Sequence, residues 1–90
     1  MEQRHKSNAV GAQIRKLRSA KDMTQERLVA QCQLTGLGLT RGTLAKIEAQ
    51  IRGCSAEELF IIAKVLGVRM EELFPRGYPA TLKAGRRADD

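Results

Sequence analysis

The segment from Ser55 to Gly67, SAEELFIIAKVLG, constrains the fold most, because it carries the start, the apolar face and the end of one helix. Ser55 and Glu58 stand at the spacing of a capping box, in which each side chain bonds the other residue's backbone N–H. Gly67 suits the left-handed residue that commonly ends a helix. The segment therefore predicts an amphipathic helix. Its buried face consists of Leu59, Ile62, Ala63 and Leu66.

The amino-acid composition favours the same kind of structure elsewhere in the chain. The 90 residues suit one small domain, near the lower limit at which a single hydrophobic core stabilises a fold without disulfides or metal ions. Aromatic residues make up only 3% and Trp is absent, so the core must be built from Leu, Ile, Val, Ala and Met. Such a composition suits packed helices better than strands. We therefore expect a compact all-α fold with five helices.

Three of these helices are expected before the segment at residues 55–66, each after a residue that can cap its first turn. The first covers about residues 9–21, the second begins after residue 24, and the third covers residues 39–48. The expected caps are Ser7 or Asn8, Thr24 and Thr40. The positions expected to be buried are Val10, Ile14, Leu17, Leu28, Val29, Cys32, Leu44 and Ile47.

The remaining segments define the expected domain boundaries. Residues 68–74, VRMEELF, predict a last short helix that closes over the core through Val68, Leu73 and Phe74. Residues 75–90 contain two prolines and two glycines and lack periodicity, which is typical of a flexible tail. We therefore expect an N-terminal arm at residues 1–8, a domain at 9–74 and a tail at 75–90.

The charge distribution points to a polyanionic partner. The formal net charge is +6, and residues 1–52 hold 10 basic and 4 acidic side chains, against 2 and 4 in residues 53–74. The excess of positive charge therefore lies in residues 1–52. A solvated surface is also often basic, so the placement of the charges on the helices must decide between these interpretations.

The order of three segments resembles the phage-repressor and Cro-type helix-turn-helix family over roughly residues 9–74. The segments are IRKLRSAKDMTQERLVAQ, LTRGTLAKIE and SAEELFIIAKVLGVRMEELF. The specific marks within them are Arg18, the pair Thr24-Gln25, Leu28, TLAKIE, and AKVLGV followed by EELF.

The connection between the second and third helices departs from this pattern. The family usually has a short, tight connection, whereas about five extra residues occupy Gln33 to Leu37 here. Either the second helix gains a turn or the loop bulges outward, and both can leave the third helix correctly placed because longer loops cost little entropy. We expect the second and third helices to keep the orientation usual in the family, joined by a longer connection.

The resemblance implies that the helix at residues 39–48 reads the major groove of double-stranded DNA. Arg41 can offer a planar fork to a guanine, and Lys46 can reach a guanine or a phosphate. A glycine costs a helix about 1 kcal/mol relative to Ala, so Gly42 indicates a close approach to DNA or to a neighbouring helix. The expected base contacts are Arg41, Gly42 and Lys46, and the expected backbone contacts are Gln25, Thr40, Thr43 and Arg52.

The same resemblance implies two structural roles. Arg18 and Glu48 are expected to form a partly buried ion pair that locks the third helix in place. Similar regulators often pair near the end of the domain, and the corresponding residues are Val68, Met70 and Phe74. These three residues either form a homodimer contact, which forms in solution or only on DNA, or complete the core of the monomer.

Catalytic and cofactor chemistry has little support in the sequence. The single histidine, His5, falls in the expected N-terminal arm, and no Cys or Ser has an evident base partner. Cys32 and Cys54 lack zinc-ligand spacing and are expected to be reduced thiols. We expect no enzyme activity, no metal, no cofactor and no small-molecule ligand. The longest apolar run, Leu59 to Ala63, is too short to cross a membrane, so a cytoplasmic protein of bacterial or phage type, nucleoid-associated, is expected.

The functional hypothesis is therefore a sequence-specific transcription regulator. We expect a repressor that occludes a promoter, because 90 residues leave little room for a ligand or polymerase-contact module. The alternatives are a protein-interaction module, such as an adaptor or antitoxin-like subunit, and a nonspecific nucleic-acid binder. Salt dependence separates DNA binding from an apolar protein interface, and competition with unrelated DNA separates specific from nonspecific binding.

Overall fold

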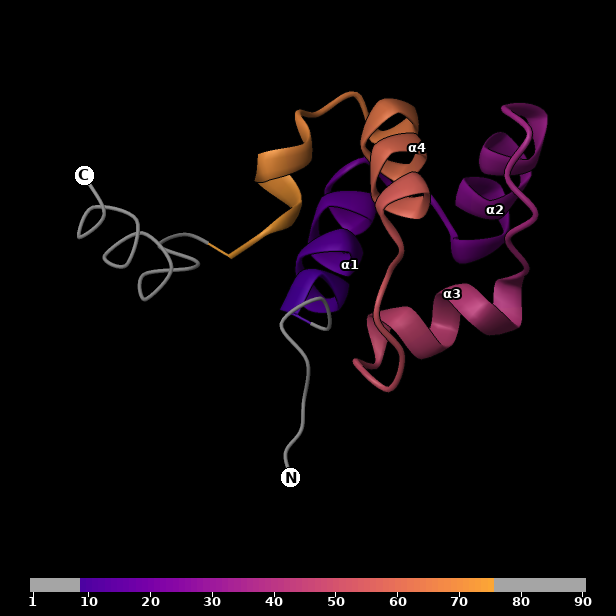
Figure 1. Cartoon of the computed structure of the whole chain (residues 1–90). Helices are drawn as coiled ribbons and strands as arrows, with labels where there is room; N and C mark the ends of the chain where they lie inside the picture. The colour runs from indigo at the N-terminus through magenta and orange to yellow at the C-terminus, as the bar shows by residue number, and fades with distance from the viewer. Residues whose placement is uncertain (1–8, 76–90) are drawn as a thin grey trace, which may run out of the picture.

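The computed structural model describes residues 9–75 and contains four α-helices and one short 3₁₀ helix. The α-helices are α1 (Val10–Ala20), α2 (Gln25–Leu34), α3 (Arg41–Glu48) and α4 (Ala56–Leu66), and the 3₁₀ helix is η2 (Met70–Leu73). Figure 1 shows α3 lying across one end of the molecule, beneath α2 and α4. The all-α prediction is confirmed. The fifth predicted helix is only a 3₁₀ turn. The predicted N-terminal arm at residues 1–8 and the predicted tail, from residue 76 onward, lie outside the described residues.

The helix starts follow the predicted caps. The side chains of Thr24 and Thr40 accept hydrogen bonds from the backbone N–H groups of Arg27 and Thr43. Ser55 and Glu58 form the predicted capping box at the start of α4. At α1 the N-cap position is held by Ala9 without a side-chain cap, and Ser7 and Asn8 lie outside the described residues.

All four α-helices end in the same way, with a residue in the left-handed conformation. Backbone bonds then run from this residue and the next one back into the last turn, the pattern known as a Schellman motif. The left-handed residues are Asp22, Gly36, Gln50 and Gly67. Because each motif satisfies carbonyls that the helix leaves unpaired, the chain reverses direction at these points without losing backbone hydrogen bonds.

The core is aliphatic and is shared by all of the elements. The fully buried side chains in it include one or more from every helix: Val10, Ile14, Leu28, Cys32, Leu39, Leu44, Ile47, Ile62, Leu66 and Leu73. η2 closes one side, where the Gln13 side chain of α1 donates to the backbone carbonyl of Glu72. The predicted apolar faces therefore meet at one centre, as the helical spacing required.

The connection between α2 and α3 follows the first of the two predicted possibilities, a longer second helix, and not the second, a loop that bulges outward. α2 continues through Leu34, and the chain then turns at Gly36. Leu37 and Leu39 return to the core with exposures of 8% and 1%, so the connection lies against the domain and does not bulge outward. The Gln33 side chain also donates to the backbone carbonyl of Leu39 at 2.8 Å. The connection thus contributes two apolar anchors, and one of them, Leu37, is among the extra residues.

The backbones of α1 and α3 approach each other closely at Gly11. A Cβ atom placed on Gly11 would overlap the carbonyl oxygen of Ile47, and no side-chain rotation relieves a contact between two backbones. Glycine at position 11 therefore sets how near α1 lies to the last turn of α3.

Candidate nucleic-acid interface

A bidentate ion pair between Arg18 of α1 and Glu48 of α3 forms the base of the candidate interface. Nε of Arg18 lies 2.7 Å from Oε2 of Glu48, and a terminal nitrogen of Arg18 donates to Oε1 at 2.9 Å. The Arg18 and Glu48 side chains are only 12% and 4% exposed. The hydrogen bond with Glu48 raises the pKa of Arg18, against the opposing effect of burial, and a smaller contribution comes from the charge of Glu26.

Two further hydrogen bonds extend this pair into a network across three helices. Arg18 donates to the carbonyl of Met23 at 2.7 Å, and Gln25 at the start of α2 donates to Glu48 at 2.9 Å. The network therefore joins the ends of α1 and α3 to the first turn of α2. One amide N–H of Gln25 is used inside the protein, so the predicted phosphate contact would fall to its second N–H.

The outer face of α3 carries two basic side chains among small residues. At 3.6 residues per turn, five residues fall within a sector of about 140°. They are Arg41, Gly42, Ala45, Lys46 and Ala49. Leu44 and Ile47 are buried on the opposite side, and Glu48 is buried at the edge of this sector, next to Arg41. Lys46 is exposed and has no hydrogen-bond or ion-pair partner among residues 9–75.

Gly42 is exposed on this outer face, and no helix lies against it. A Cβ atom built there would have only the Thr40 hydroxyl within reach, at 4.0 Å. Of the two explanations predicted for Gly42, close approach to a neighbouring helix is therefore wrong within the described residues. The other explanation, that the backbone at Gly42 comes close to DNA, stays a prediction.

Thr40 and Thr43 interact with each other at the start of α3. The Thr40 hydroxyl accepts from the backbone N–H of Thr43 at 3.2 Å and donates to the Thr43 hydroxyl at 3.1 Å. Both residues therefore shape the N-terminus of α3, where unpaired N–H groups and the helix dipole favour an anion.

Arg52 is engaged inside the protein. It donates to both carboxylate oxygens of Glu58 at 3.0 Å and to the carbonyl of Gly53 at 3.0 Å. Burial alone would raise the pKa of Glu58, but the hydrogen bonds from Arg52 and Ser55 outweigh it and hold this pKa below its ordinary value. Arg52 thus ties the α3–α4 connection to the capping box of α4, a contact that the sequence analysis did not predict.

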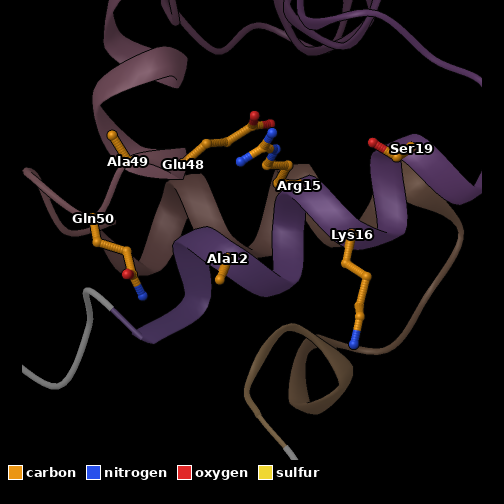
Figure 2. Close-up of a pocket in the computed structure, with 7 residues that line it drawn as sticks. All are labelled: Ala12, Arg15, Lys16, Ser19, Glu48, Ala49 and Gln50. Atoms are coloured by element: carbon orange, nitrogen blue, oxygen red, sulfur yellow. The ribbon is translucent and has the colours of Figure 1, made fainter.

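A hollow between α1 and the end of α3 brings in two basic residues that the sequence analysis missed. Figure 2 shows that its lining comes from α1 and from residues 48–50. Arg15 and Glu48 point toward one another across it, whereas Lys16 points to the other side of α1. An adjoining hollow shares Arg15 and continues to Gln25 and to Ala45 on the outer face of α3. Arg15 of α1 thereby lies along the same hollow as Ala45 of α3.

Arg41 meets an acidic residue of α2. Its Nε lies 3.2 Å from Oε2 of Glu26, and the two side chains are 62% and 65% exposed. This pair joins the first turns of α2 and α3, the two helices that carry the predicted contacts.

The predicted dimer residues Val68, Met70 and Phe74 are all partly buried against the core. This arrangement fits the interpretation in which they complete the monomer, and each also keeps some exposed surface. The dimer contact stays a prediction.

Thiol, metal and membrane features add no second candidate site. Cys32 and Cys54 are free, and burial raises their pKa values to about 11 and about 12. No three or more His, Cys, Asp or Glu residues cluster as metal ligands within residues 9–75. In the same range no helix has the length and apolar character to span a membrane.

Two capped helices joined across a polar network, with the second exposing a basic outer face, define a helix-turn-helix protein of the DNA-binding class. A family model described as helix-turn-helix matches residues 14–73. The chain belongs to this family, of the phage-repressor and Cro type. No curated protein and no solved structure matches the chain significantly.

Proposed function

We propose that this DNA-binding protein is a sequence-specific transcription regulator that reads the major groove of double-stranded DNA with α3. The observation that carries the proposal is the outer face of α3, on which Arg41 and Lys46 flank an exposed Gly42 with nothing packed on it. A solvated surface requires no glycine at this position, whereas a partner that meets the helix backbone does.

In the proposed complex, base and phosphate contacts come from different helices. Arg41 presents its planar fork to O6 and N7 of a guanine, and Lys46, about one turn further, reaches a guanine or a phosphate. The N-terminus of α2 and the second amide N–H of Gln25 bind a phosphate. Arg15 of α1 is added to the backbone contacts because it lines the hollow that reaches Ala45 on the outer face of α3. The ion pair with Glu58 makes Arg52 a weaker contact than predicted.

The proposal is tested by selecting a binding site from a random DNA library and measuring variants on it. Arg41→Ala should lose about 1–3 kcal/mol of binding free energy on the selected site and relax one base position, because a bidentate guanine contact is lost. Lys46→Ala should weaken binding and leave helical content unchanged. Lys64→Ala, which removes an exposed lysine from α4, is the matched control and should bind as the parent does. If both α3 variants bound like the control, the assignment of α3 would be wrong.

Gly42→Ala should separate stability from binding. Alanine is favoured over glycine in a helix by about 1 kcal/mol, and the structure offers its Cβ free space, so the variant should unfold at higher urea concentration. The same methyl group should reduce affinity for the selected DNA site, because it stands between the helix backbone and the base edges. Urea denaturation and a binding titration measure the two effects. A more stable variant with unchanged DNA affinity would exclude a close backbone approach at Gly42.

We further propose that the protein represses transcription by occluding a promoter, in the cytoplasm of a bacterial or phage-infected cell and without a cofactor. The alternative is a protein-interaction module on the same fold. Binding through several phosphates should weaken steeply with salt, whereas an apolar protein interface should respond little. Domain limits at residues 9–74, with an arm before them and a tail after them, belong to the same proposal.

A twofold dimer is proposed because one short helix reads only a few base pairs. The contact would use the exposed parts of Val68, Met70 and Phe74, in solution or only on DNA. Half-site centres should then lie about 10–10.5 base pairs apart, and inserting half a turn between them should abolish tight binding. A selected site that is a single asymmetric element, bound by one chain and insensitive to its flanks, would show that the protein binds as a monomer.

A further inference from the structure

Within residues 9–75, Glu26 is the acidic residue that the structure brings to the predicted base reader Arg41. Its carboxylate oxygen Oε2 lies 3.2 Å from Nε of Arg41, although the two residues are 15 positions apart in the chain. Glu26 is in the first turn of α2, where a carboxylate is favoured by the helix dipole, but the same position faces DNA in the proposed complex. A negative charge there repels phosphate, so its presence beside Arg41 needs a reason beyond the stability of α2.

The geometry of the contact leaves the base-reading part of Arg41 available. A guanidinium has five N–H donors in a fixed fork, and guanine is recognised through two of them in parallel. The closest approach of Glu26 is to Nε, on the side of the fork nearest the helix. The two terminal nitrogens lie on the far edge, which is the edge that can face O6 and N7 of a guanine. Glu26 and a guanine can therefore hold Arg41 at the same time.

We infer that Glu26 is a positioning residue that sets the base preference of Arg41. By binding Nε it orients the far edge of the guanidinium toward the groove. On a sequence without a guanine at that position, it keeps Arg41 paired and so prevents the arginine from moving to a phosphate. Glu26 thus raises discrimination by lowering the affinity for wrong sequences, which is a known route to specificity. This inference rests on the proposed function of α3.

The variant that tests it is Glu26→Gln, which removes the charge and keeps the side-chain shape. Discrimination between the guanine and other bases at the Arg41 position should fall about two- to five-fold, the range expected for an exposed ion pair. Affinity for unrelated DNA should rise, and the plot of log affinity against log salt for that DNA should steepen by up to about one unit. The steeper slope reports that the released arginine now binds a phosphate.

Two controls separate this role from a structural one. In an Arg41→Ala background, Glu26→Gln should no longer change the base preference at that position, because there is no arginine left to orient, and the salt slope should change less than it does with Arg41 present. Glu57→Gln removes a first-turn carboxylate from α4, a matched loss of helix-dipole stabilisation, and should leave the base preference unchanged.

The possible outcomes are distinguishable. If Arg41→Ala alters the selected sequence but Glu26→Gln does not, the inference about Glu26 is overturned and the function of α3 stands. If Glu26→Gln lowers discrimination equally with and without Arg41, Glu26 acts by another route and the inference is again overturned. If neither Arg41→Ala nor Lys46→Ala changes binding, the proposed function itself fails.

Discussion

Replacing Glu48 with alanine should lower the free energy of unfolding by up to about 3–5 kcal/mol, because it leaves the largely buried Arg18 side chain without its counter-charge. A domain of this size is stabilised by only about 5–15 kcal/mol, so much of the stability would be lost. The variant also removes the acceptor of Gln25. Urea denaturation followed by circular dichroism measures the loss.

The matched control is a double variant in which Arg18 and Glu48 are both replaced by leucine. Removing both charges leaves no ion unpaired, so this variant should be clearly more stable than Glu48→Ala. Glu57→Ala, at an exposed carboxylate of α4, should change stability little. If Glu48→Ala cost no more than Glu57→Ala, the buried pair would not be what holds α3 to α1.

Gly11→Ala should destabilise the fold by about 2–3 kcal/mol, although alanine is the better helix former by about 1 kcal/mol. The added methyl group would overlap the Ile47 carbonyl oxygen, and both atoms belong to rigid helices, so α1 and α3 must move apart. The loss should appear in urea or thermal denaturation. Gly42→Ala is the control, because it makes the same change at a helical position where the added methyl group meets no other helix. A gain in stability in both variants would contradict the close approach at Gly11.

The caps and the apolar faces could be predicted because their signals are local. Thr24, Thr40 and the Ser55–Glu58 pair each act on backbone groups two or three residues away, so the sequence shows both partners together. The apolar spacing likewise indicated which side of each helix is buried. These signals place four helices but do not give the distances between them.

The parts that escaped prediction depend on residues far apart in the chain. The pairing of Arg41 with Glu26 arises only when the first turns of α2 and α3 meet. Arg15 looked like an ordinary exposed residue, because the apolar pattern of α1 shows that it faces outward but not that α3 ends beside it. Arg52 was expected at DNA because of its charge, and its two bonds with Glu58 depend on how the α3–α4 connection folds.

The connection between α2 and α3 was predicted to be longer than is usual in the family. Its attachment to the core through Leu37 and Leu39 was not predicted. Sequence length shows that extra residues are present, and the two glycines suggest a turn. Whether Leu37 and Leu39 face solvent or the core depends on the exact path of the chain after Gly36, because consecutive positions in an extended segment point to opposite sides.

The burial of these two leucines determines how the orientation of α3 could be changed by mutation. In a loose linker, the orientation of a helix is altered by adding or removing residues, whereas here Leu37 and Leu39 are packed in the core, so their bulk is expected to influence the position of α3. Swapping either leucine for a smaller or larger aliphatic residue would tilt α3 in small steps. Added residues are better accommodated at Gly38, which is exposed and has open space around it. The volume of these two core side chains is thus expected to set the orientation of α3, independently of the residues proposed to contact DNA.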